Sequence, residues 1–275
     1  MSFNFCILAS GSSGNCAVVW TEKAVILIDC GCSARYILEN LHSLNFSPKD
    51  INAVVITHAH CDHIASSAMN FLIEKNIPIY IDDDVYCDIL PKHKGKIKEC
   101  KTRNISDFFK IKDIEICAFK LFHKDNSINR CFGFTFSSAV NQKKYKIGYI
   151  TDTGKITSSI AEKLANSNIL AIEANYDEKL LSESFRPEKN KEWILSTYGH
   201  LSNKSCAKAI IEISKLSTTT DSLKYIFLSH LSRHHNNENL AIRTVSEILF
   251  KEKITPSKIL AAKRNKKMPA IKITQ

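Results

Sequence analysis

Short runs of apolar, often β-branched residues recur along the chain and are separated by Gly, Ser, Asn and Asp. Runs of this length, bounded by turn-forming residues, are typical of buried β-strands. The pattern predicts strands over residues 3–9, 16–20, 24–29, 53–56, 78–81, 114–121, 131–137, 145–150, 169–172 and 225–228.

Between these runs, apolar residues return every three or four positions, which is the period of an amphipathic helix. In residues 34–44 the apolar positions are Ile37, Leu38, Leu41 and Leu44, and Ser33 is placed to cap the helix N-terminus. Similar spacing predicts helices over residues 62–75, 159–165, 191–196, 203–213 and 239–250.

Strands and helices alternate in both halves of the chain, and no linker, repeat or low-complexity stretch separates them. Such alternation fits two β-sheets with helices on their outer faces. The expected fold is therefore α/β, a four-layer αββα sandwich, and residues 1–275 are expected to form a single domain. With 44% hydrophobic residues, the chain has enough apolar material for a large core.

The sequence has no apolar run long enough to cross a bilayer and no N-terminal signal with a charged leading segment. We therefore expect a cytoplasmic protein with no membrane partner. The ten cysteines include no Cys-x-x-Cys pair and fall largely within apolar runs, which indicates free, buried thiols in a reducing compartment. Metal binding by Cys30 and Cys32 is a less favoured alternative.

The formal net charge of +10 changes the picture of possible partners. A basic excess of this size favours polyanions, although lysines spread over a surface also serve solubility. Basic residues cluster at 92–101, 143–146 and 263–267. A single basic cluster is more often a solvent-exposed surface than a phosphate-binding one. The three clusters together make nucleic acid a candidate partner.

The densest chemistry lies directly after the predicted strand 53–56, where the chain reads Thr-His-Ala-His-Cys-Asp-His over residues 57–63. Imidazole nitrogens and carboxylate oxygens are ligands that zinc and similar divalent ions prefer. In an extended segment, His58 and His60 point the same way and can bind one ion, while Asp62 and His63 follow where the chain turns. A polar loop with accidental histidines is the alternative, and a chain with only ten histidines makes it improbable.

Other blocks accompany this one along the chain. They are Leu-Ala-Ser-Gly-Ser-Ser-Gly-Asn-Cys at 8–16, Leu-Ile-Asp-Cys-Gly at 27–31, Thr-Asp-Thr-Gly at 151–154, Glu-Ala-Asn-Tyr-Asp at 173–177, Gly-His-Leu-Ser-Asn at 199–203 and Ser-His-Leu-Ser at 229–232. With His-x-His-x-Asp-His, this ordered set resembles the metallo-β-lactamase superfamily and, within it, the bacterial YycJ/WalJ-type metallohydrolases. The resemblance extends over nearly the whole chain.

The resemblance implies a centre of two divalent metal ions, with zinc expected and manganese as the alternative. Its metal ligands would be His58, His60 and His123 for one ion, Asp62, His63 and His230 for the other, and Asp152 as the bridge. A bridging carboxylate and hydroxide offset the repulsion of two dications, and the metal-bound hydroxide would act as nucleophile. Asp62 is counted among the catalytic residues as well as the ligands.

Three further positions are expected to support this centre. Asp29 is expected to accept a hydrogen bond from a ligand imidazole and fix its tautomer, with a simple turn role as the alternative. His200 and Glu173 resemble the pair that delivers a proton to the leaving oxygen in the tRNA 3′-processing endonucleases. A carboxylate beside an imidazole favours its protonated form, as a general acid requires.

Ser202 is expected to cap a helix whose free amides, with Asn203, face a substrate anion; a purely structural capping loop is the alternative. Two positions depart from the YycJ/WalJ pattern. The loop after His123 is longer and more polar than in that family, and Tyr176 stands where the family tends to have His, so no role is carried over to either.

Three functions remain open at this point. The resemblance implies a nuclease, specifically a DNA 5′→3′ exonuclease, and the net charge of +10 agrees with a nucleic-acid substrate. A hydrolase acting on a small thioester, lactam, lactone or cyclic phosphodiester is the runner-up. A metal-binding scaffold without catalysis is disfavoured, because all seven expected ligands are present.

Overall fold

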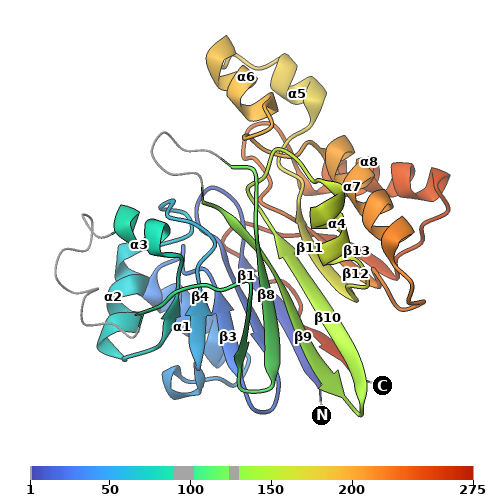
Figure 1. Ribbon diagram of the computed structural model, residues 1–275. Coiled ribbons are helices and arrows are strands. Elements are labelled where there is room, and N and C mark those ends of the chain that lie inside the picture. Colours follow the sequence, from blue (N-terminus) through green and yellow to red (C-terminus); the bar gives the residue numbers. More distant parts are fainter. Residues whose placement is uncertain (1, 90–101, 124–129, 275) are drawn as a thin grey trace. The chain divides into compact units, whose positions relative to one another are not determined.

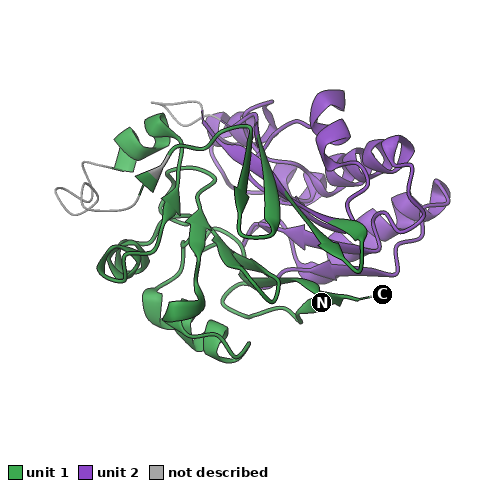
Figure 2. Ribbon diagram, turned by 60° about the horizontal axis from the view of Figure 1, so that its bottom comes forward, with its two compact units in different colours: residues 1–118, 136–145, 264–275 green, residues 119–135, 146–263 purple. Residues whose placement is uncertain are grey.

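The computed structural model describes residues 2–89, 102–123 and 130–274. The chain forms two compact units (Figure 2). Unit 1 contains residues 1–118, 136–145 and 264–275, and unit 2 contains residues 119–135 and 146–263. The basic residues expected to cluster at 92–101 lie outside the described residues, as does most of the polar loop after His123.

One seven-stranded sheet belongs to unit 1. Its strands, in order across the sheet, are β14 (Ile271–Ile273), β1 (Phe3–Ala9), β2 (Cys16–Trp20), β3 (Val25–Ile28), β4 (Ala53–Val55), β5 (Ile79–Tyr80) and β6 (Thr102–Arg103). The pairs from β14 to β3 are antiparallel and those from β3 to β6 are parallel. Parallel neighbours need crossover connections, and a helix lies in each of these three connections. The helical segments of unit 1 are α1 (Ala34–His42), the 3₁₀ turn η1 (Pro48–Asp50), α2 (Ser66–Glu74) and α3 (Asp83–Ile89).

The second seven-stranded sheet has the order β13 (Lys258–Ala261), β12 (Tyr225–Ser229), β11 (Ile169–Glu173), β10 (Lys143–Ile150), β9 (Phe132–Val140), β8 (Ile114–Lys120) and β7 (Phe108–Ile111). Strands β10 to β13 are parallel, and every residue of β11 is buried, as expected for a strand covered on both faces. Its connections contain α4 (Ser158–Leu164), α5 (Glu178–Ser182), α6 (Glu188–Leu195), α7 (Asn203–Leu216) and α8 (Glu238–Lys251). Figure 1 shows how these elements follow one another.

Most predicted elements are confirmed, and two strands, β1 and β2, match to the residue. The cap of α1 is confirmed too, because the Ser33 side chain accepts a hydrogen bond from the Tyr36 backbone. The helix predicted over residues 62–75 was wrong at its start, since α2 begins only at Ser66. The Asp62 and His63 carbonyls accept hydrogen bonds from Asn15 and Cys30 instead, which keeps this segment out of the helix.

The elements that the pattern missed are short or weakly apolar. Helix α5 has five residues, and β14 has three, with a lysine in the middle. Strand β7 has four residues, of which only Ile111 is buried, and Lys110 interrupts its apolar run.

The cysteines follow the prediction within the described residues, where all of them are free and most are buried. Burial raises the pKa of the Cys32 thiol to about 11, so the thiol is protonated near neutrality. No helix among the described residues is both long and apolar enough to cross a membrane.

Candidate functional site

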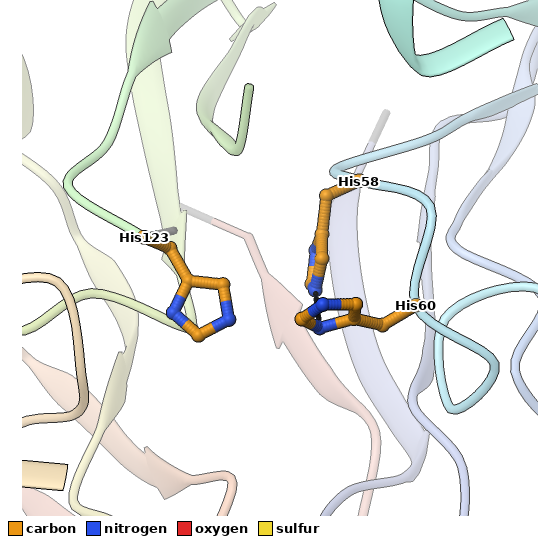
Figure 3. Close-up of side chains that lie close together, drawn as sticks. All are labelled: His58, His60 and His123. Atoms are coloured by element: carbon orange, nitrogen blue, oxygen red, sulfur yellow. Dashed lines mark hydrogen bonds between the residues drawn. The ribbon is translucent and has the colours of Figure 1, made fainter. Parts of the chain in front are cut away.

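In unit 1, the loop that leaves β4 brings two imidazoles together. The His58 Nε2 and His60 Nδ1 atoms lie 2.9 Å apart (Figure 3). His58 is buried and its Nδ1 atom lies 3.0 Å from the Thr57 hydroxyl, which helps to fix the ring. Two ring nitrogens at this separation are suitably placed to bind one divalent ion.

Asp29 holds the His63 ring through its Nδ1 atom, so Nε2 lies on the opposite edge of the ring. The His63 Nδ1 atom lies 2.7 Å from Asp29 Oδ2, and both side chains are fully buried. Asp29 also accepts hydrogen bonds from the Thr57 amide at 2.8 Å and the Thr57 hydroxyl at 3.0 Å. Burial raises the pKa of Asp29, and the His63 and Thr57 contacts offset part of that shift. The arrangement directs His63 Nε2 away from Asp29, as the sequence argument expected of a ligand imidazole.

Asn15 contributes a contact that the sequence argument did not foresee. Its side-chain amide nitrogen lies 3.2 Å from Asp62 Oδ2 and 3.0 Å from His63 Nε2, and its backbone amide donates to the Asp62 carbonyl. Asn15 therefore joins the Ser/Gly loop of residues 10–14 to the two predicted ligands that end the His-rich loop. The asparagine at the end of the Ser-Gly block was the available signal.

Gly31 makes this close approach possible. A Cβ atom at Gly31 would lie 1.7 Å from the Asp62 carbonyl oxygen, which is a severe overlap with backbone. The position therefore demands glycine for space, because Asp62 passes directly against it.

In unit 2, four side chains from separate segments converge. They are Asp152, Glu173, His200 and His230, and one potential ligand atom from each lies within 4.8 Å of all the others. The His230 Nδ1 atom lies 3.3 Å from Asp152 Oδ1, and the His200 Nδ1 atom lies 3.9 Å from the same oxygen.

Glu173 is the centre of this cluster. Its Oε1 atom lies 2.8 Å from Nδ1 of both His200 and His230, while its Oε2 atom accepts the Thr153 and Leu201 amides. A carboxylate accepts at both contacts, so each imidazole donates through Nδ1 and keeps Nε2 for another task. Burial acts to raise the pKa of Glu173, but the charge of His200 and the two imidazole hydrogen bonds outweigh it and lower the pKa.

The contact between Glu173 and His230 was not predicted from the sequence, which paired Glu173 with His200 alone. One buried carboxylate therefore orients both a predicted metal ligand and the predicted proton donor. Its place at the last residue of β11, with Ser229 opposite on β12, accounts for the shared contact.

His123 follows β8 and is buried. Its Nδ1 atom lies 3.2 Å from the Gly199 carbonyl oxygen, so the carbonyl fixes this nitrogen as the donor and Nε2 as the acceptor. Gly199 itself has no room for a side chain, because a Cβ atom would lie 2.2 Å from the Trp193 carbonyl oxygen.

Three of the predicted residues share an unusual backbone. Asp29, Asp152 and His230 have φ of 58°, 58° and 55°, and each directly follows or closely follows a strand. A left-handed conformation is uncommon outside glycine, and buried examples concentrate at functional sites. The conformation turns the chain sharply at the strand end.

The structure gives Ser202 and Asn203 partners inside the fold. Ser202 caps α7, because its hydroxyl accepts the Ser205 amide at 3.0 Å and donates to Glu178. The Asn203 side chain is buried and exchanges hydrogen bonds with Asn236 at 3.1 and 2.8 Å. The capping role is confirmed, and the substrate role expected for both residues stays a prediction.

The described basic clusters are partly engaged. Lys144 lies 2.6 Å from Glu115, and Lys146 donates to the Ala165 carbonyl at 2.7 Å. Near the C-terminus, Lys267 donates to the Ser43 hydroxyl, while Lys263 and Lys266 are exposed. Only part of each cluster is therefore available to a polyanion.

The chemistry of these donors fits divalent metal ions. Each unit offers imidazole nitrogens together with carboxylates. The Nδ1 atoms of His63, His230 and His123 contact Asp29, Glu173 and the Gly199 carbonyl, respectively. Such outer partners set the imidazole tautomer that a metal requires.

Comparison with known proteins adds the family. The family described as "Beta-lactamase superfamily domain" matches residues 25–231. The exodeoxyribonuclease WalJ of Streptococcus pneumoniae is 32% identical over 250 residues, which cover 89% of this chain and 87% of that protein. The exodeoxyribonuclease YycJ of Bacillus anthracis is 28% identical over 252 residues, covering 90% of each chain.

Among solved structures, the metallo-β-lactamase fold protein YhfI of Bacillus subtilis is similar, with a TM-score of 0.69 at 14% identity. The match covers 99% of this chain and all of YhfI. At this identity it shows the fold alone, and it confirms the predicted fold class.

Proposed function

The chain belongs to the β-lactamase superfamily, and on that premise we propose that it is a nuclease that hydrolyses phosphodiester bonds in DNA. Its family and fold make it a hydrolase, and they imply the use of divalent metal ions. The choice of a nuclease over a small-molecule hydrolase is supported by one feature of the site and by the curated relatives.

The supporting feature is the pair formed by His200 and Glu173, at 2.8 Å, beside Asp152. Phosphodiester hydrolysis expels an alkoxide, which leaves readily only if a proton reaches it. The His200 side chain is only 12% exposed, and its Nδ1 atom contacts the fully buried Glu173 carboxylate. Thioester hydrolysis expels a thiolate, which needs much less help from a proton donor, so the pair argues against a thioesterase. Lactam, lactone and cyclic phosphodiester hydrolysis also need a proton donor, and DNA is preferred to these substrates on the relatives and the net charge.

The relatives named exodeoxyribonuclease support DNA as the substrate and exonucleolytic cleavage as the mode. Their alignments cover about nine-tenths of this chain. The net charge of +10 agrees with a polyanionic substrate. We further propose that cleavage proceeds in the 5′→3′ direction, on the basis of the resemblance to YycJ/WalJ-type metallohydrolases.

The metal assignment in this proposal is the one made from the sequence: two divalent ions, zinc or manganese, held by His58, His60, Asp62, His63, His123, Asp152 and His230. When bound, such ions activate water and stabilise charge on the entering and leaving oxygens.

The remaining roles belong to side chains that do not bind metal in this proposal. Asp29 orients His63, and Glu173 orients His230 through its Nδ1 atom. In this proposal His200 acts as an imidazolium, which donates from Nδ1 to Glu173 and delivers the proton on Nε2 to the leaving oxygen. Burial of the Glu173 carboxylate keeps water from competing for these bonds.

Incubation of metal-loaded protein with end-labelled DNA and RNA, single- and double-stranded, tests the proposal. We expect stepwise release of nucleotides from DNA and at most slow cleavage of RNA. A 3′ label should stay on long products until late, because digestion starts at the 5′ end. Rapid hydrolysis of nitrocefin or a thioester, with both nucleic acids left intact, would overturn it.

A further inference from the structure

Helices α5 and α6 with the turns around them, residues 178–198, form an arm that projects from the rest of unit 2 (Figure 1). The arm carries three exposed aromatic rings. Phe185 is fully exposed, and Trp193 and Tyr198 are 41% and 45% exposed. Several large rings exposed on one projecting segment make it a candidate interaction surface.

Trp193 is the ring nearest to the proposed chemistry. Its centroid lies 5.3 Å from that of His200, with the rings nearly perpendicular at 83°, and 5.8 Å from that of His123. One edge of the indole is thus in contact with the proposed proton donor, while two-fifths of the residue faces solvent.

Backbone contacts fix this position. The His200 amide donates to the Ile194 carbonyl at 3.0 Å, and Gly199 passes against the carbonyls of Trp193 and Ile194. The C-terminal end of α6 and the backbone of Gly199 and His200 are therefore held directly against each other. A group that contacts the open side of Trp193 is held close to His200.

Trp193 lies outside the buried cluster that anchors the arm. That cluster consists of Tyr176, Leu181 and Ile194, each no more than 6% exposed. The Trp193 indole instead packs against the His123 and His200 rings and leaves its other side open to solvent.

The arm is electrically balanced, in contrast to the chain as a whole. It holds four acidic residues, Glu178, Glu183, Glu188 and Glu192, and four basic residues, Lys179, Arg186, Lys189 and Lys191. The formal charge of the whole chain is +10. A neutral surface with aromatic rings is poorly suited to following phosphates and well suited to contacting bases.

We propose that Trp193 is a base-stacking residue, which binds an unpaired nucleobase beside the phosphodiester that His200 serves. The inference rests on the proposed nuclease function and deepens it, because it makes a single-stranded end the preferred substrate. Every base has a π-face, so stacking on an indole is tolerant of sequence, as an exonuclease that advances along a strand requires.

The test uses one oligonucleotide in three forms: unmodified, and with an abasic nucleotide on either side of the first cleavable phosphate. Wild type should cleave one abasic form with kcat/KM lower by roughly 5- to 150-fold, the effect of one lost base stack. Trp193→Ala should cleave the unmodified strand at that reduced rate, with no further loss on the abasic strand. Trp193→Phe should keep most of the preference.

Phe250→Ala is the matched control, because Phe250 is an aromatic residue of unit 2 that is 75% exposed on α8. It should leave the preference unchanged. If Trp193→Ala slows unmodified and abasic strands equally, Trp193 merely positions His200, and the inference is wrong while the nuclease proposal stands.

Two other results distinguish failure of the base-stacking inference from failure of the proposed nuclease function. If Trp193→Ala changes the mass in sedimentation without altering the abasic preference, the arm is a self-association surface and the inference is wrong. If wild type cleaves no oligonucleotide in any form, the proposed function itself fails, and the base-stacking role fails with it.

Discussion

The two units supply their predicted ligands in opposite ways. In unit 1, His58, His60, Asp62 and His63 come from one loop of a few residues after β4. In unit 2, the cluster is drawn from strand ends and a loop that are far apart along the chain. A dense local motif points to its chemistry by itself, whereas the scattered residues of unit 2 were named only through the family resemblance.

The two units also stabilise their imidazoles in similar ways. Asp29 contacts His63 in unit 1, and Glu173 contacts His230 and His200 in unit 2. Both carboxylates are fully buried at the end of a β-strand. The difference is that Glu173 serves two imidazoles, so its loss should affect metal binding and proton transfer together, whereas loss of Asp29 should affect metal binding alone.

The largest effect should come from Asp152→Ala. The change removes the carboxylate that the proposal assigns as the bridge between two ions, so metal and activity should be lost together. Elemental analysis after metal saturation should fall from about two ions per chain to one or fewer, and cleavage should drop to background. Wild-type protein that never binds more than one ion would contradict the dinuclear proposal.

His200→Ala should separate proton transfer from metal binding. The variant should keep the metal content of wild type yet lose roughly 10²- to 10⁴-fold in rate, the usual contribution of a general acid. A substrate with a p-nitrophenolate leaving group should recover most of the loss, because that group leaves without a proton. If His200→Ala instead empties a metal site, then His200 is a ligand and the assignment of His230 is wrong.

Glu173→Gln and Asp29→Asn test the difference between the two carboxylates. Removal of such an orienting partner typically weakens metal affinity by about 10- to 100-fold. We expect that loss in both variants, measured by competition with a chelator. At saturating metal, Asp29→Asn should regain most of its activity, whereas Glu173→Gln should stay slow because His200 also loses its partner. Equal recovery by both would mean that Glu173 does not act through His200.

The sequence predicted much of the fold and much less of the contacts. Strands β1 and β2 were predictable because long apolar runs mark buried strands, and the His-rich loop was predictable because its ligands are contiguous. The roles of Asn15 and of Glu173 toward His230 were not predictable from pattern. They depend on which loops the sheet order brings together, and periodicity carries no information about that.

Asn15→Ala tests the contact that the sequence did not reveal. Asn15 is fully buried and its side-chain amide donates to the Asp62 carboxylate, so its loss should free this predicted ligand from its anchor. We expect a loss of metal affinity at the low end of the 10- to 100-fold range. Ser12→Ala, at an exposed position of the same loop, should have no effect and serves as the control. Unchanged metal affinity in Asn15→Ala would make Asn15 a structural residue only.

The smallest effect should come from Glu178, which contacts the capping residue of α7. Its carboxylate lies 2.8 Å from the Lys204 ammonium and accepts a hydrogen bond from the Ser202 hydroxyl at 3.0 Å. The hydrogen bond from Lys204, followed by that from Ser202, lowers the pKa of Glu178 below its ordinary value of 4.5. A lowered carboxyl pKa stabilises the fold above the unfolded pKa, and the stabilisation is lost as pH falls through the folded value.

Glu178→Gln should therefore lower the melting temperature at pH 7 by only about 1–2 °C, or roughly 0.5 kcal/mol or less, because both partners are substantially exposed. The difference from wild type should shrink steadily as pH falls below about 4.5, since wild type then loses the same charge. Glu247→Gln, at an exposed position on α8, is the matched control and should show no such convergence. A gap between Glu178→Gln and wild type that persists at low pH would mean that the carboxylate charge is not what stabilises this contact.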